Sequence, residues 1–149
     1  LFDRTIVRAE SFSVKMPEGW QVKKEKSEVT FTSFETDLFT DMPVAIFSIY
    51  AEKQKGALFM DDLFPELLHT LQREDGKVLA TGEELIDEQK ACWVLFRYNK
   101  SEIAVMSLYI ADDYNRLVRI QYVGTLKKFK EYGKIFDVFK KSIKLKRAM

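Results

Sequence analysis

Apolar residues alternate with polar ones along much of the chain, and this period of two predicts β-strands. The first clear case is the segment 12–16, in which Phe12, Val14 and Met16 share one face. Strands buried on both faces are apolar at consecutive positions, and three segments fit that description: 44–51, 92–98 and 103–110. Further strands are predicted at 20–24, 29–34, 77–87 and 117–123.

Two segments have the i, i+3, i+4, i+7 apolar spacing of a helix with one buried side. The first helix is predicted at 61–74, with the stripe Met60, Leu63, Phe64, Leu67, Leu68 and Leu71. The second is predicted at 126–144, with the stripe Leu126, Phe129, Tyr132, Phe136, Phe139 and Ile143. We expect Asp61 or Asp62 to cap the first helix. Pro65 is expected in its first turn, where no helical N–H bond is lost, and Gly76 just after its end.

The order of these elements predicts an α+β fold with an antiparallel sheet. Short polar turns such as 99–101 and 112–115 join successive strands, and strands joined in this way pair antiparallel. Strands that are apolar on both faces need cover on both sides, which two amphipathic helices would supply. We therefore expect residues 1–149 to form a single domain in which two helices cover the sheet, an α/β/α sandwich.

Composition agrees with a folded domain and argues against a nucleic-acid binder. The hydrophobic fraction is 46% and the formal net charge is only +1, whereas nucleic-acid binders are usually basic. The charge is nevertheless unevenly placed. Residues 125–149 carry nine basic and two acidic groups, a net of +7, and the rest of the chain carries 15 and 21, a net of −6.

The sequence has few residues with which to build a catalytic or metal site. His69 is the only histidine, and we interpret it as a partly exposed helix residue. Cys92 is the only cysteine and lies in an apolar strand, where burial makes a thiol inert. One histidine and one cysteine are too few for a typical zinc site. With no nucleotide-binding or nucleophile-elbow motif present, we expect no cofactor, no metal and no enzymatic activity.

The strand 12–16 runs into Pro17-Glu-Gly-Trp20 and then into a second strand. This Pro-x-x-Trp strand end resembles the PsbP-like superfamily, which includes the DcrB-like proteins, and the element order that follows resembles it too. The resemblance implies an α/β/α sandwich without shared catalytic residues. It also implies an accessory or binding role, often in bacterial envelope lipoproteins and in some relatives as cytosolic chaperones. No functional residue of the superfamily can be carried onto this chain.

Two features are candidates for binding. The acidic connection 35–42 contains the apolar residues Leu38, Phe39 and Met42, which either form a partner surface or fold back over a sheet edge. The second helix carries a ridge of lysines opposite its apolar stripe, which either contacts an anionic membrane or acidic partner or is simply a solvated face. The lysine ridge consists of Lys127, Lys130, Lys134, Lys141 and Lys144.

The leading hypothesis is a non-enzymatic binding or accessory domain with a protein partner, as the soluble part of a bacterial envelope lipoprotein. Because the chain begins at Leu1 rather than Met, we expect a trimmed or mature form, and the given sequence would not show a signal peptide or lipid-anchor cysteine upstream of it. One alternative is a cytosolic chaperone or adaptor that holds a hydrophobic partner segment on its sheet. Another is a hydrolase with an unrecognised site.

Overall fold

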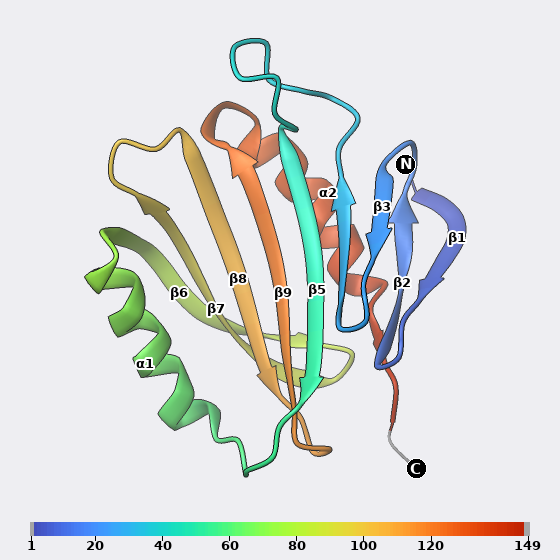
Figure 1. Cartoon of the computed structure of the whole chain (residues 1–149), viewed down its shortest axis with the longest axis vertical. Coiled ribbons are helices and arrows are strands. Elements are labelled where there is room, and N and C mark those ends of the chain that lie inside the picture. Colours follow the sequence, from blue (N-terminus) through green and yellow to red (C-terminus); the bar gives the residue numbers. More distant parts are fainter. Residues whose placement is uncertain (1, 148–149) are drawn as a thin grey trace.

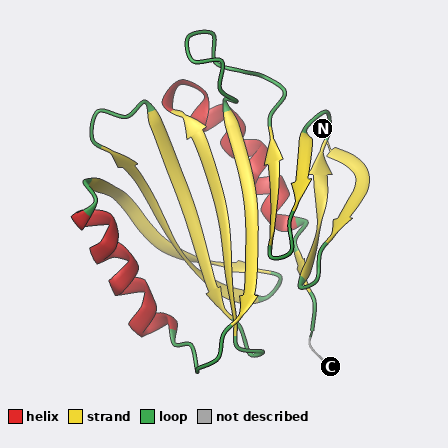
Figure 2. Ribbon diagram, in the orientation of Figure 1, coloured by secondary structure: helices red, strands yellow, loops and turns green. Residues whose placement is uncertain are grey.

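The computed structural model describes residues 2–147, with side chains from Thr5 onward. A seven-stranded antiparallel sheet has the order β3-β4-β5-β9-β8-β7-β6, and a three-stranded sheet has the order β1-β2-β10 (Figures 1 and 2). The strands are β1 (Phe2–Arg8), β2 (Phe12–Pro17), β3 (Gln21–Lys24), β4 (Glu28–Thr32), β5 (Ala45–Lys53), β6 (Gly76–Ile86), β7 (Gln89–Tyr98), β8 (Ile103–Ala111), β9 (Arg116–Thr125) and β10 (Lys144–Leu145). The helices are α1 (Met60–Arg73) and α2 (Phe129–Lys141), with a short 3₁₀ turn, η1 (Leu126–Lys128), before α2.

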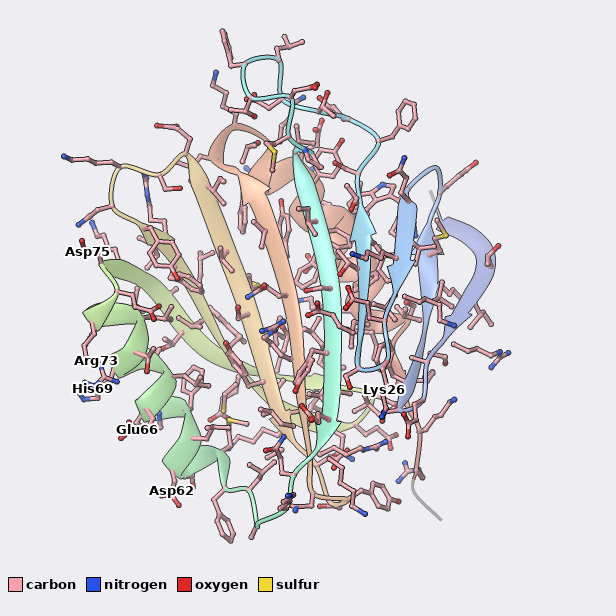
Figure 3. All side chains as sticks on the ribbon, in the orientation of Figure 1. Lys26, Asp62, Glu66, His69, Arg73 and Asp75 are labelled. Atoms are coloured by element: carbon pink, nitrogen blue, oxygen red, sulfur yellow. The ribbon has the colours of Figure 1, made fainter. Side chains whose placement is uncertain are left out.

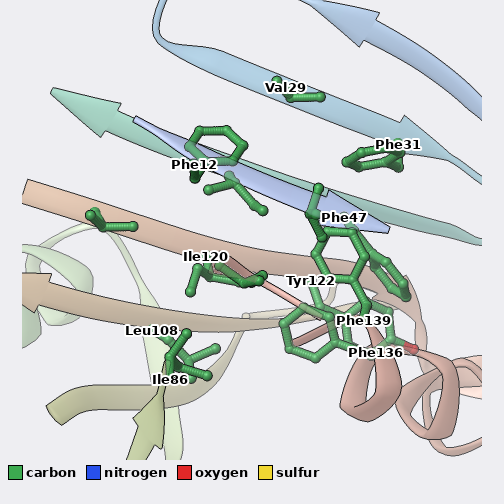
Figure 4. Close-up of a cluster of buried hydrophobic side chains, with 14 of the residues drawn as sticks. Phe12, Val29, Phe31, Phe47, Ile86, Leu108, Ile120, Tyr122, Phe136 and Phe139 are labelled. Carbon is green, nitrogen blue, oxygen red and sulfur yellow. The ribbon is translucent and has the colours of Figure 1, made fainter. Parts of the chain in front are cut away.

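The main core lies between the large sheet, α2 and β2. Phe47 of β5 pairs with Tyr122 of β9, and both rings pack against Phe136 of α2 (Figure 4). Phe12 of β2 belongs to the same cluster and is almost fully buried. The sheet face that carries Phe47 and Tyr122 is therefore the one that α2 covers.

The opposite face of the sheet is only partly covered. Helix α1 packs over β6 to β8, where Phe64, Leu68 and Leu71 contact a small cluster formed by Val94, Phe96 and Val105. No residue of α1 is fully buried. The rest of this face, over β4, β5 and β9, has no helix above it in Figure 1. We call this uncovered part the open face.

The structure confirms the predicted α+β class, with an antiparallel sheet and two helices. The predicted α/β/α sandwich is confirmed only in part, because a helix covers only part of the second face of the sheet. Each strand predicted from the sequence is present, with bounds that differ by a few residues. The strands β1 and β10, which form the second sheet with β2, were not predicted.

Three details of the first helix were predicted wrongly. Phe59 occupies the N-cap position with no side-chain hydrogen bond, so neither aspartate caps the helix. Pro65 lies inside the helix rather than in its first turn. After the helix, Asp75 rather than Gly76 adopts the left-handed conformation, with φ 64°. Gly76 is required for another reason, because a Cβ there would lie 2.7 Å from the carbonyl oxygen of Leu71.

The second helix is shorter than predicted, and this changes the lysine ridge. Helix α2 ends at Lys141, after which the hydroxyl of Ser142 accepts a hydrogen bond from the backbone N–H of Lys15 in β2. Ile143 leads into β10 and is buried in the same core as the helix. Its apolar side chain therefore extends the helical pattern past the true end of the helix.

Candidate functional site: the 34–43 loop and the recess beside it

The connection between β4 and β5 projects beyond the ends of the central strands, at the top of Figure 1. We refer to residues 34–43 as the 34–43 loop. Its two arms pair through a bridge between Thr36 and Pro43, and the N–H of Asp37 donates to the carbonyl of Met42 at 2.7 Å. The Asp37 carboxylate also accepts from the N–H and hydroxyl of Thr40 at 3.2 and 3.0 Å. These bonds give the tip of the loop a defined conformation.

Helix α2 holds the base of the loop through Glu35. The hydroxyl of Tyr132 donates to Oε1 of Glu35 at 2.6 Å, and Nζ of Lys128 lies 3.3 Å from Oε2. The Tyr132 hydrogen bond, followed by the Lys128 ammonium, lowers the pKa of the Glu35 carboxyl. Burial, followed by the Glu35 bond, raises the pKa of Tyr132. At neutral pH these two pKa shifts keep Glu35 ionised, as the hydrogen-bond acceptor, and Tyr132 protonated, as the donor. The hydrogen bond that anchors the loop to the helix is therefore kept.

The apolar side chains of the loop point into solvent. Leu38 is 96% exposed and Phe39 87% exposed, and Phe34 and Met42 are exposed as well. The alternative that the apolar residues fold back over a sheet edge is therefore wrong for Leu38 and Phe39. Nζ of Lys127 in η1 lies 5.6 Å from the centre of the Phe39 ring, which places a cation beside the apolar tip.

Beside the loop, where the ends of β5, β9 and β8 meet, is a recess of about 330 Å³. We call it the apolar recess, because its walls are formed largely by apolar side chains. It is lined by Asp37, Thr40, Met42, Pro43, Ile46, Glu102, Ile103, Val123, Gly124 and Thr125. The only charged groups in this lining are the carboxylates of Asp37 and Glu102.

The open face continues from the recess and is polar. The amide of Gln121 donates to the hydroxyl of the buried Ser107 at 2.8 Å. Further along, Arg119 forms an ion pair with Glu28 at 2.7 Å, and its Nε is buried without a hydrogen-bond partner. A long apolar segment laid on this face would desolvate these polar groups without satisfying them, which is costly.

The lysine ridge is present in part. Lys127, Lys130, Lys134 and Lys141 are exposed, with Lys127 in η1 rather than in the helix. Lys144 lies in β10, where its Nζ is 3.7 Å from a carboxylate oxygen of Asp87. Asp137 is exposed on α2 between Lys134 and Lys141 and pairs with Lys140 at 3.3 Å. The ridge is therefore shorter and less uniformly positive than the sequence predicted.

The residues considered for chemistry lie apart from the recess. His69 is exposed on the outer side of α1, near Glu66 and Arg73 and away from the sheet (Figure 3). Cys92 is buried as predicted, and burial raises the pKa of its thiol. Among the described side chains, from Thr5 to Arg147, no three of His, Cys, Asp or Glu gather in a way that would hold a metal ion. Neither helix in this range has the length and apolar content needed to cross a membrane.

Sequence reasoning identified Leu38 and Phe39 but missed the recess. Its walls come from three strands that are distant in sequence, represented by Ile46, Ile103 and Val123. Only the strand order β5-β9-β8 brings them together. The one local feature of the sequence that could have pointed to the recess is Glu102-Ile103, a charged residue beside an apolar one at the start of a strand.

Comparison with known proteins places the fold. No family model matches this chain, and no curated protein sequence matches it. Among solved structures, the cyanobacterial PsbP protein of Synechocystis superposes with a TM-score of 0.61 over 91% of this chain and 86% of its own, at 14% identity. LpqN of Mycobacterium tuberculosis, involved in cell envelope biogenesis, gives 0.65 over 98% and 92%, at 10% identity. The Ran-binding protein Mog1p of Saccharomyces cerevisiae gives 0.60 over 97% and 96%, at 9% identity.

At these identities the likeness concerns the fold. The chain has the same fold as the cyanobacterial PsbP protein, and the resemblance seen in the sequence is confirmed at the level of the fold. The functions named for these three proteins are not carried over to this chain by the shared fold.

Proposed function

We propose that this chain is a non-enzymatic binding or accessory domain that contacts a protein partner through the 34–43 loop. The observation that carries the proposal is the exposure of Leu38 and Phe39, at 96% and 87%. An exposed apolar side chain forgoes the free energy that burial would provide. Several exposed apolar side chains close together therefore mark an interaction surface. The loop is also hydrogen-bonded internally and anchored to α2, so binding would order few additional groups.

The similar structures support a binding role and a location. One of them is a Ran-binding protein and another is involved in envelope biogenesis. We propose the cell envelope or periplasm of a bacterium as the location, with this chain as the soluble part of a lipoprotein. A cytosolic chaperone or adaptor is the alternative, but the polar open face is poorly suited to holding a long hydrophobic segment. The gene sequence upstream of Leu1 distinguishes these two locations, because a signal peptide with a lipid-anchor cysteine favours the envelope.

The loop proposal predicts the loss of partner binding when the loop is made polar. The double variant Leu38→Ser/Phe39→Ser removes two exposed side chains, so its free energy of unfolding should stay within about 0.5 kcal/mol of the wild type. Its affinity for a partner should fall on the order of 100-fold, because apolar anchors dominate interface energies. The measurement is quantitative co-purification from cells that express the protein.

The matched control is Leu85→Ser, which removes an exposed apolar side chain from β6. This variant should retain the same partners as the wild type. Equal recovery of all partners by the loop variant would contradict the proposal.

A second proposal concerns the lysine ridge, which would make a weak contact with an anionic membrane surface. Lysines near such a surface contribute about 1 kcal/mol each, and Lys127, Lys130, Lys134 and Lys141 are exposed. We expect weak co-sedimentation with anionic vesicles at low salt that is lost at physiological salt, because charges there are screened within about 8 Å. Replacing the five ridge lysines with glutamine should abolish it. If the wild type does not sediment at low salt, the ridge is only a solvated face.

A further inference from the structure

The apolar recess lies beside the exposed loop tip and contains two carboxylates that take part in no ion pair of the described residues. Asp37 and Glu102 both line the recess. In the part of the chain that the structure describes, no basic side chain lies within ion-pair distance of either carboxylate. By contrast, Glu35 at the base of the same loop is paired with Lys128. The recess therefore combines apolar walls with two carboxylates that form no ion pair within the described residues.

On this basis we propose that the recess accepts a large apolar side chain from a protein segment in which a neighbouring residue is Lys or Arg. The inference rests on the proposed function and specifies the chemistry of the partner. Ile46, Ile103 and Val123 would contact the apolar side chain, while Asp37 and Glu102 would attract the adjacent cation. Leu38 and Phe39 would pack against the flanking part of the same segment.

Size and polarity favour this occupant over others. A volume of about 330 Å³ is at the lower end for ligand pockets, so it suits a short part of a partner rather than an extended apolar stretch. On the open face next to it, the amide of Gln121 is partly exposed and can bond to the backbone of a peptide but not to hydrocarbon. An anionic lipid headgroup is disfavoured inside the recess, because the only charged groups in its lining are the carboxylates of Asp37 and Glu102.

The test is selection from a phage-displayed random peptide library on the intact chain. We expect the enriched peptides to share an aliphatic or aromatic residue next to Lys or Arg. Replacing the apolar residue of a selected synthetic peptide with Ala should weaken its binding roughly 10- to 100-fold. Glu102→Lys should weaken the same peptide at least about 5-fold, since it converts an attraction into a repulsion. The matched control Glu66→Lys, on the outer side of α1, should leave the affinity unchanged.

The outcomes separate this inference from the loop proposal. Enrichment that depends on Leu38 and Phe39 but shows no preference for basic residues, or no response to Glu102→Lys, would overturn the inference and leave the loop proposal standing. Enrichment that is unaffected by Leu38→Ser/Phe39→Ser would count against both. Failure to enrich any peptide would overturn the inference that a short linear segment is recognised. Loop-dependent binding to anionic vesicles in place of peptides would overturn it as well.

Discussion

Replacing Asp112 with alanine should lower the free energy of unfolding by about 3–5 kcal/mol, because it leaves a buried cation without its partner. The side chains of Asp112 and Arg116 are only 2% and 9% exposed, and they form an ion pair at 2.7 Å. Oδ1 of Asp112 also accepts from the backbone N–H groups of Tyr114 and Arg116 at 2.9 and 3.0 Å. All three of these interactions are lost in the variant.

The same guanidinium connects the turn between β8 and β9 to both ends of the chain. Arg116 donates to the carbonyl of Ser11 at 3.4 Å and to the carbonyl of Lys146. Urea denaturation monitored by circular dichroism measures the change, and Asp113→Ala, at the exposed neighbouring position, is the matched control. The control should change stability by no more than about 0.5 kcal/mol. A loss below about 1 kcal/mol in Asp112→Ala would show that the pair does not hold these segments together.

Replacing Phe47 with alanine should have a similarly large effect, about 3–5 kcal/mol, because it opens a cavity in the centre of the main core. Phe47 is fully buried, and its ring centre lies 4.6–5.3 Å from the ring centres of four other aromatic residues. These residues are Trp20, Tyr122, Phe136 and Phe139. They come from the sheet, from α2 and from the segment after Pro17, so a cavity here weakens every layer that contacts α2.

The matched control is the same substitution at Phe39, which is 87% exposed. Phe39→Ala should leave the free energy of unfolding within about 0.5 kcal/mol of the wild type. Thermal denaturation checks both variants, with a shift of roughly 2–4 °C expected for each kcal/mol in a domain of this size. If the two substitutions cost the same, the assignment of Phe47 to the core and Phe39 to a free surface would be wrong.

The sequence was sufficient to predict the parts of the fold in which local pattern and burial agree. The doubly apolar segments became the strands β5, β7 and β8. Strands β7 and β8 contribute buried side chains to both the main core and the cluster under α1, whereas β5 is covered on the α2 side only and its other side belongs to the open face. The helical stripes likewise predicted α1 and α2. The end of α2 was missed because Ile143 is buried although it lies outside the helix. Periodicity reports which side chains are buried and does not show where the backbone leaves the helix.

The candidate site was predictable only where it is local. Leu38 and Phe39 stand out as apolar residues in an acidic connection, and five hydrogen bonds within 37–42 fix the tip. The recess depends on which strand ends become neighbours, and that follows from long-range pairing between β5, β9 and β8. The lysine ridge was overestimated because an ideal helix was assumed through Lys144, which instead pairs with Asp87.

The most direct test of the central claim is site-specific photo-crosslinking in intact cells. A photoreactive phenylalanine analogue at position 39 would probe the 34–43 loop, and the same analogue at position 85 would probe another exposed apolar position, on β6. The account predicts a discrete protein adduct from position 39, competed by wild-type chain and not by Leu38→Ser/Phe39→Ser, with no such adduct from position 85. The absence of a protein adduct at position 39, or the same adducts from both positions, would contradict it.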